Sequence, residues 1–187
     1  MNTVLIVIAA IGAVIGVIIL IYNGLVMKRQ RVNQAFADVD VQLKQRQNLI
    51  PNLVETVKGY AAHEQATFQQ VIAARNAAQA ASTAGEMAKA EGVLSQALGK
   101  LFALAEAYPD LKANTNFLQL QQQLSSIEDK LAAARRFYNS AVQDYNTARE
   151  QFPGSIIAGS FNFESREFFD VGVEGRSAMD EPPKVAF

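Results

Sequence analysis

An uninterrupted apolar stretch near the N-terminus constrains this chain more than any other feature of its sequence. Residues 4–21 read VLIVIAAIGAVIGVIILI, with no charge, no amide and no proline. As an α-helix this stretch extends about 27 Å, close to the thickness of a bilayer's hydrocarbon core. It also lacks the polar stripe that a core helix of a soluble domain would show. We therefore predict a membrane span.

The residues around the stretch predict an uncleaved anchor and its orientation. Residues 1–3 provide no basic side chain and no small-residue cleavage site follows, which makes a cleaved signal peptide the weaker alternative. Tyr22 stands where an amphipathic ring marks a membrane interface. The basic residues Lys28, Arg29 and Arg31 come next. By the positive-inside rule, we expect the N-terminus outside and the bulk of the chain in the cytoplasm.

A glycine pair within the span is a candidate for self-association. Gly12 and Gly16 form a GxxxG pattern, and small residues at this spacing let two membrane helices approach closely. Glycine is also common in membrane helices, so a single pair is a weak signal. Gly12 and Gly16 are nevertheless the self-association face that the sequence offers.

Beyond residue 27 the sequence predicts an all-α domain. Apolar residues recur at alternating spacings of three and four, which is the period of an amphipathic helix. The first stripe has one defect, Arg46, and otherwise consists of Val32, Phe36, Val39, Leu43, Ile50, Leu53, Val57 and Tyr60. The pattern predicts further helices up to Ser82, over residues 86–107, and over about 36 residues that end before Pro153-Gly154. Leu124 and Leu131 are expected in the core of the last helix.

Pro51 leaves the path of the first helix open. A proline inside a helix removes one backbone hydrogen bond, so the chain either kinks or reverses there. A reversal would give four helices of similar length. No glycine or polar loop surrounds Pro51, so we expect a kink and a long first helix. Gly59 is expected to weaken the helix that follows without ending it.

The chain therefore divides into three expected parts. Residues 1–27 form a transmembrane anchor, residues 28–152 an up-and-down antiparallel bundle of the four-helix type, and residues 153–187 an irregular aromatic segment with a flexible tail. We expect order to be lost near Val171. Four phenylalanines in this last part either cover the bundle end, which we favour, or contact a partner or the membrane: Phe161, Phe163, Phe168 and Phe169.

The sequence offers no catalytic, metal or cofactor site. Its net charge of −1 gives no electrostatic reason to expect nucleic acid as a partner, and it has no cysteine and one histidine. A zinc-protease motif at His63-Glu64 would need a second histidine one turn later, where Thr67 stands. Arg135 and Arg136 are interpreted as a solvated flank of the core stripe. We expect no enzyme and no bound cofactor.

Three stretches resemble the LemA family of bacterial membrane proteins. They read DVDVQLKQRQNLIPNLVETVKGYAAHE at 38–64, LFALAEAYPDLKANTNFLQLQQQL at 101–124, and ARRFYNSAVQDYN with QFPGSIIAG at 134–146 and 151–159. The resemblance extends from Tyr22 to about Phe169. It implies a helical bundle on a single-pass anchor in the bacterial inner membrane, and it brings no catalytic residues. It also implies links to magnetosome membranes in one branch and to a membrane-bound zinc protease.

We therefore expect a non-enzymatic scaffold that associates with copies of itself as a homo-oligomer and has the lipid bilayer as a partner. An adaptor or regulator of a membrane-bound zinc protease is the first alternative. A signalling module is the second, and the three residues before the span provide it with no sizeable outside sensor.

Overall fold

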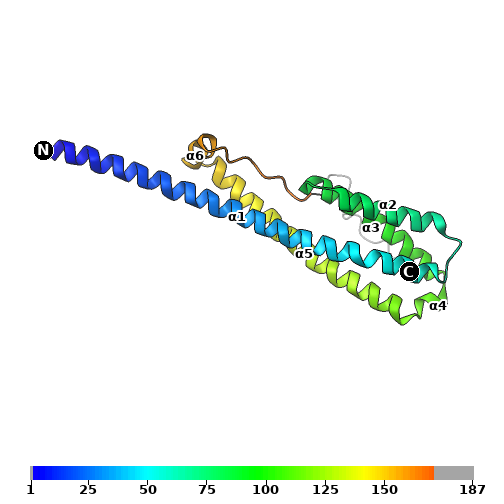
Figure 1. The fold of residues 1–187 in the computed structure, drawn as a ribbon. Coiled ribbons are helices and arrows are strands. Elements are labelled where there is room, and N and C mark those ends of the chain that lie inside the picture. Colours follow the sequence, from blue (N-terminus) through cyan, green and yellow to red (C-terminus); the bar gives the residue numbers. More distant parts are fainter. Residues whose placement is uncertain (1, 171–187) are drawn as a thin grey trace, which may run out of the picture. The chain divides into compact units, whose positions relative to one another are not determined.

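The computed structural model describes residues 2–170, and these residues form helices joined by short loops (Figure 1). The expected all-α fold, with a long apolar N-terminal helix followed by helices that pack together, is confirmed. The tail expected to lose order near Val171 lies outside the described residues. In chain order the helices are α1 (Asn2–Lys58), α2 (Gln65–Ala80), α3 (Ala84–Glu106), the single turn α4 (Pro109–Lys112), α5 (Thr115–Glu150) and α6 (Gly154–Ser160).

Helix α1 continues through Pro51 and ends at Lys58. Pro51 lies inside α1, so the chain does not reverse there. The prediction for Gly59 is wrong, because α1 ends at Lys58 and a loop over residues 59–64 leads into α2. Glycine is strongly favoured just beyond a helix C-terminus, where its backbone freedom lets the chain leave the helix. The Ala61 amide donates to the Val57 carbonyl at 3.0 Å and closes the last turn.

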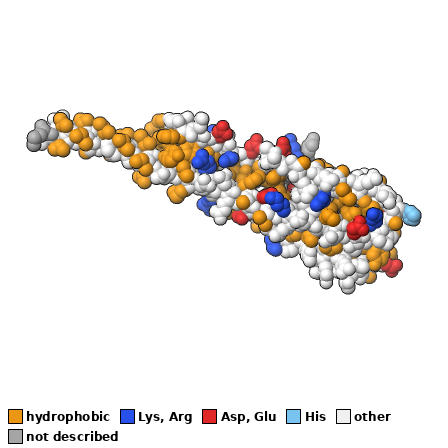
Figure 2. Space-filling view, in the orientation of Figure 1, with side chains coloured by type: hydrophobic (Ala, Val, Ile, Leu, Met, Phe, Trp, Pro, Cys, Tyr) orange, Lys and Arg blue, Asp and Glu red, His pale blue; other side chains and the backbone are white. Residues whose placement is uncertain are grey.

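The chain divides into two compact units, and the first comprises Met1–Asp38 and Arg136–Glu167. Its described part contains the N-terminal part of α1, the end of α5, and α6. The rings of Phe36 and Tyr138 lie 5.7 Å apart between α1 and α5. The apolar window of α1 is 0% buried and is the one stretch of the described chain long and apolar enough to cross a membrane. Hydrophobic side chains cover this stretch in Figure 2.

The second unit comprises Val39–Arg135 and, within the described chain, residues 168–170. It is an up-and-down bundle of the end of α1, α2, α3 and the first part of α5. Arg75 of α2 donates to the Gln47 carbonyl of α1 at 3.0 Å, and Lys100 of α3 donates to Gln70 of α2 at 3.4 Å. Most predicted core positions are buried, including Ile50, Leu53, Val57, Leu94, Leu101, Leu124 and Leu131. The prediction is wrong for Tyr60, which is 42% exposed beyond the end of α1.

The turn between α2 and α3 is closed by a capping box. The Glu86 amide donates to the Thr83 hydroxyl at 3.2 Å, and the Glu86 carboxylate accepts from the backbone amides of Ser82 at 3.0 Å and Thr83 at 3.1 Å. These backbone hydrogen bonds lower the pKa of Glu86. The box places the start of α3 at Ala84, two residues before the start that the periodicity predicted.

A buried ion cluster interrupts the core of the second unit. Arg46, the defect in the predicted stripe, is 2% exposed, and Glu91 of α3 is 1% exposed. Arg46 Nη1 lies 2.7 Å from Glu91 Oε2, and Arg46 Nη2 lies 2.9 Å from both Ser95 Oγ and Glu128 Oε1. Gln47 Nε2 donates to the other Glu91 oxygen at 3.3 Å. The cluster thus joins α1, α3 and α5 through one guanidinium.

The expectation that residues 153–187 are irregular is wrong in part. Residues 154–160 form α6, and an extended segment follows to the end of the first unit. A helix of seven residues completes about two turns, which is too short for a hydrophobic period to be recognised in the sequence.

The ion cluster predicts a strong dependence of bundle stability on Arg46. Arg46→Ala should lower the free energy of unfolding of the second unit by about 3–5 kcal/mol, because Glu91 would stay buried without a partner. Replacing both charges, as in Arg46→Met with Glu91→Leu, should recover most of the loss. Urea unfolding of the full-length protein in detergent, followed by circular dichroism, measures both.

Lys44→Ala is the matched control, because Lys44 pairs with Asp40 at 2.6 Å on the exposed side of the same helix. An exposed pair contributes about 1 kcal/mol or less. If Arg46→Ala and Lys44→Ala lowered the free energy of unfolding equally, the buried ion cluster would not be what stabilises the second unit.

Candidate functional site

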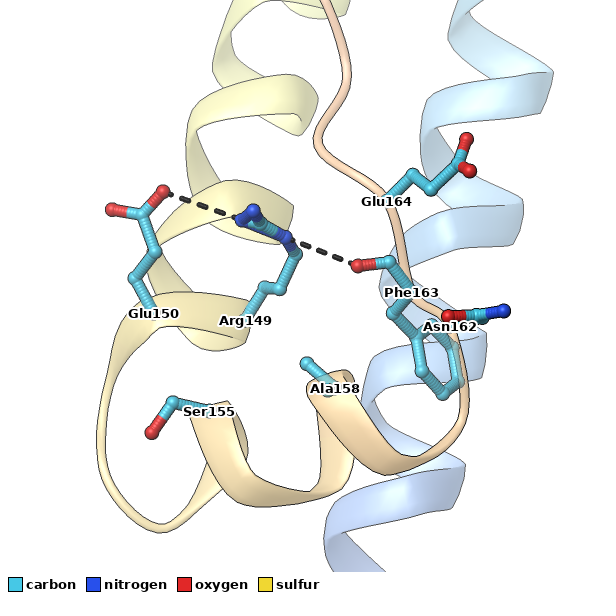
Figure 3. Close-up of a pocket in the computed structure, with 8 residues that line it drawn as sticks. Arg149, Glu150, Ser155, Ala158, Asn162, Phe163 and Glu164 are labelled. Atoms are coloured by element: carbon cyan, nitrogen blue, oxygen red, sulfur yellow. Dashed lines mark hydrogen bonds and ion pairs between the residues drawn. The ribbon is translucent and has the colours of Figure 1, made fainter.

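The candidate site is the corner where the chain leaves α5 and returns along it. We call residues 149–163 the α6 corner: the end of α5, α6, and the first residues of an extended return segment, 161–167. All of these residues belong to the first unit, together with the N-terminal part of α1. Figure 3 shows the corner with α1 behind it.

A proline and a glycine give the corner its shape. Pro153 and Gly154 follow α5, as predicted for a helix stop, and the Ser155 amide donates to the Gln151 carbonyl at 2.8 Å. A Cβ on Gly154 would collide with the backbone oxygen of Ala148, so only glycine fits. After α6, Asn162 adopts a left-handed backbone with φ of 53° and turns the chain into the return segment.

Side chains of α5 hold the return segment in place. The Tyr145 hydroxyl donates to the Glu164 carbonyl at 2.8 Å, and the Tyr138 hydroxyl donates to the Glu167 carbonyl at 2.8 Å. Asn146 pairs with the backbone of Arg166 in both directions, at 2.9 and 3.0 Å. These bonds replace those that an extended backbone would otherwise make to a neighbouring strand. Burial raises the pKa of the Tyr138 hydroxyl, against the effect of the nearby Arg166.

A polar pocket of about 370 Å³ lies on one side of the corner (Figure 3). Arg149 Nε donates to the Phe163 carbonyl at 3.1 Å, and Arg149 Nη1 lies 3.5 Å from Glu150 Oε1. Ser155, Asn162 and Glu164 complete the polar lining, which contains no histidine. The pocket therefore offers one cation and two carboxylates for ionic and hydrogen-bonding contacts, and Ser155 has no imidazole beside it to act as a base.

An apolar groove of about 390 Å³ lies between α1 and α6. Its lining comes from residues 13–21 of α1 on one side and from the start of α6 on the other: Ala13, Val14, Val17, Ile18, Ile21, Pro153, Ile156 and Ile157. Three large apolar side chains of the corner are exposed to solvent, Phe152 at 81%, Ile156 at 58% and Phe161 at 54%. Ile156 lines the groove itself, and the Phe161 ring packs against Tyr22 just beyond the apolar stretch.

The predicted glycine pair lies on an open face of α1. A Cβ added at Gly12 or Gly16 would meet no atom within 4 Å. Because an α-helix turns about 100° per residue, the groove residues Val14, Val17 and Ile21 point to the side opposite the two glycines. The glycine face is therefore free of α6 in the first unit.

The four phenylalanines singled out in the sequence divide between the two units. The rings of Phe161 and Phe163 pack against Tyr22 at 5.0 and 5.6 Å, and Phe163 is buried beneath the Arg29 guanidinium at 5.0 Å. Phe168 and Phe169 belong to the second unit, the former exposed and the latter buried. The favoured interpretation, that the segment completes a core, therefore fits Phe163 and Phe169, whereas Phe161 and Phe168 remain available for contacts.

The interpretation of Arg135 as a solvated residue is wrong. Its guanidinium lies 4.8 Å from the centre of the Phe169 ring, and burial lowers its pKa, with the nearby Glu91 opposing that effect. The arginine stacks on an aromatic face, an arrangement that a planar, weakly hydrated cation favours. Arg136 is exposed, as expected.

Sequence reasoning missed Phe152, Ile156 and Arg149 as site residues. A signal was present in QFPGSIIAG: a helix stop followed at once by an apolar run, where a surface loop would be polar. Two turns of helix give no hydrophobic period, so the run by itself does not predict a helix.

The comparisons with known proteins agree with the resemblance predicted from sequence. The family model of the LemA family matches residues 35–187. Magnetosome protein MamQ 2 of Paramagnetospirillum magneticum is 23% identical over 199 residues, covering 92% of this chain and 73% of that protein. Magnetosome protein MamQ of Magnetospirillum gryphiswaldense is 23% identical over 196 residues, covering 91% of this chain and 72% of that protein.

The close approach at Gly154 predicts that the corner tolerates no side chain there. Gly154→Ala should destabilise the α6 corner by about 1–3 kcal/mol, because the new methyl group and the Ala148 carbonyl must move apart. The readout is the rate of trypsin cleavage after Arg166 in the full-length protein, which should rise when the return segment detaches.

Gly159→Ala is the control, since its Cβ would meet nothing within 4 Å in the same short helix. It should leave the cleavage rate unchanged. Equal rates for the two variants would show that Gly154 does not determine the corner.

Proposed function

The chain belongs to the LemA family, and we propose that it is a membrane-anchored, non-enzymatic scaffold that associates with copies of itself. The observation that carries the proposal is the apolar window of α1. None of it is buried by the rest of the described chain, although α6 lies beside its second half, and it continues without a break into the helix that enters the bundle. The apolar helix and the family together point to a membrane protein.

The arrangement of the first unit supports lateral association through the span. Gly12 and Gly16 face away from the groove that α6 lines and have open space around them. Glycine pairs at this spacing allow two helices to pack with their backbones close together. Proteins tethered in one membrane meet at high effective concentration, so weak lateral contacts are sufficient for assembly.

The interior polar groups support a structural role for the bundle. The buried charges Arg46 and Glu91 are bound to each other and hold three helices together. Within the described residues, no three histidine, aspartate or glutamate side chains converge as a metal site would require. The bundle therefore acts through its surfaces, as a scaffold does.

The relatives named as magnetosome proteins support a role in membrane organisation. Extended to this chain, the role is to display a helical bundle on one side of a bacterial inner membrane. Lys28, Arg29 and Arg31 follow the span directly and favour the cytoplasmic side for that bundle. Partners then bind to the bundle surface or to the neighbouring copies.

The proposal predicts a homo-oligomer larger than a dimer when the full-length protein is extracted in mild detergents. Gly12→Leu with Gly16→Leu should reduce its mass, because two leucines prevent the close approach of the helices. Light scattering after size-exclusion chromatography measures the mass, and crosslinking in membranes tests the same contact without detergent.

Ala10→Leu is the control, because it adds similar bulk on the opposite side of the same helix. It should leave the mass unchanged, and circular dichroism should show an intact bundle in every variant. A protein that stays monomeric in several mild detergents and does not crosslink would contradict the scaffold and favour the protease adaptor.

A further inference from the structure

We propose that the α6 corner is a second membrane-contact site, in which α6 lies within the acyl-chain region of the leaflet on the bundle side. This inference rests on the proposed function, because it requires α1 to span the membrane. The occupant of the apolar groove is then a phospholipid acyl chain.

The first argument is the length of the span. The groove places α6 beside Ala13, Val17 and Ile21, which lie along the half of the span nearest the basic flank. If α6 were excluded from the hydrocarbon, only residues 2–12 of α1 would remain to cross it. Those residues extend about 17 Å, whereas the hydrocarbon core is about 30 Å thick. A spanning α1 therefore carries α6 into the leaflet.

The second argument is the chemistry of the exposed side chains. Phe152, Ile156 and Phe161 are each more than half exposed, and no residue of the span window is buried. Large apolar side chains exposed in this way are unfavourable in water and favourable in a bilayer. Ile156 lines the groove against α1, and Phe161 contacts Tyr22 at the end of the span, so the bilayer that surrounds the span also covers these two side chains.

The third argument is the satisfaction of the backbone. Irregular chain enters hydrocarbon only when its polar groups are bonded internally. The amides of Ile156, Phe161 and Phe163 donate to carbonyls within the corner at 3.2, 3.0 and 3.0 Å. The Ser160 hydroxyl donates to the Ile156 carbonyl at 2.8 Å. Because these groups are already hydrogen-bonded within the corner, moving them out of water costs little free energy.

Charged groups of the first unit lie where the interface would be. Phe163 contacts both Tyr22 and Arg29, and its carbonyl accepts from Arg149 in the polar pocket. Tyr22 and the basic flank mark the end of the span. The polar pocket of Figure 3 therefore lies at headgroup depth, with the apolar groove at acyl-chain depth.

Tryptophan fluorescence tests the proposal directly, because the chain contains no tryptophan. Single variants Ile156→Trp and Phe161→Trp of the full-length protein are reconstituted into phosphatidylcholine vesicles with and without bromine on the acyl chains. Both exchanges are at exposed positions, and Phe152→Trp serves as a further variant if either fails to fold. Two further variants are controls. Ile11→Trp lies within the span and gives the quenching expected in the bilayer, and Phe137→Trp lies at an exposed position beside Arg31 and gives the quenching expected outside it.

The expected result is quenching of Ile156→Trp by the brominated lipid close to that of Ile11→Trp, weaker but clear quenching of Phe161→Trp, which contacts Tyr22 at the end of the span, and little quenching of Phe137→Trp. Quenching of Ile11→Trp alone would overturn the second contact site and leave the anchor intact. A blue-shifted but unquenched Ile156→Trp would also overturn it, by showing that protein covers the corner. No quenching at Ile11→Trp would contradict the anchor itself.

Discussion

Hydrophobic burial acts on two parts of one helix in different ways, and the rest of the structure depends on that difference. Residues 4–21 of α1 are apolar on every side and none of them is buried by the described chain, so transfer into a bilayer is favourable for them. Further along the same helix the apolar residues form a stripe, and Val39, Ile50 and Leu53 are buried against protein. One uninterrupted helix therefore connects the candidate membrane span to a core.

Polar groups decide how the other helices attach to α1. In the second unit the Arg46 guanidinium binds carboxylates of α3 and α5, which gives α1 a fixed register against both. In the first unit the tyrosine hydroxyls of α5 bind an extended segment that makes no sheet. A buried polar or charged group that loses its partner destabilises the fold. These pairs therefore disfavour helix arrangements that hydrophobic contacts alone would allow.

The sequence predicted the elements with long periods and missed those set by single contacts. Periodicity predicts the 36-residue α5 and its core leucines Leu124 and Leu131. The lack of a glycine or polar loop around Pro51 predicts that α1 continues there. The end of α1 at Lys58 was missed because the tendency of one glycine to end a helix outweighed a continuing stripe. The ion cluster could not be predicted, because nothing local shows that Glu91 lies opposite Arg46. The site at α6 could not be predicted for the same reason, because nothing local in the sequence shows that α6 lies beside residues 13–21 of α1.

The anchor itself is the central claim, and its accessibility to water tests it most directly. The chain has no cysteine, so single cysteines can be placed along α1 and labelled in sealed vesicles with a water-soluble maleimide. The account predicts no labelling at exposed positions within residues 4–21, such as Leu5, Ile11 and Leu20, and rapid labelling at Met27 and Val41, which are also exposed. Equal labelling of both groups would show that the apolar helix lies in water, and would contradict the anchor.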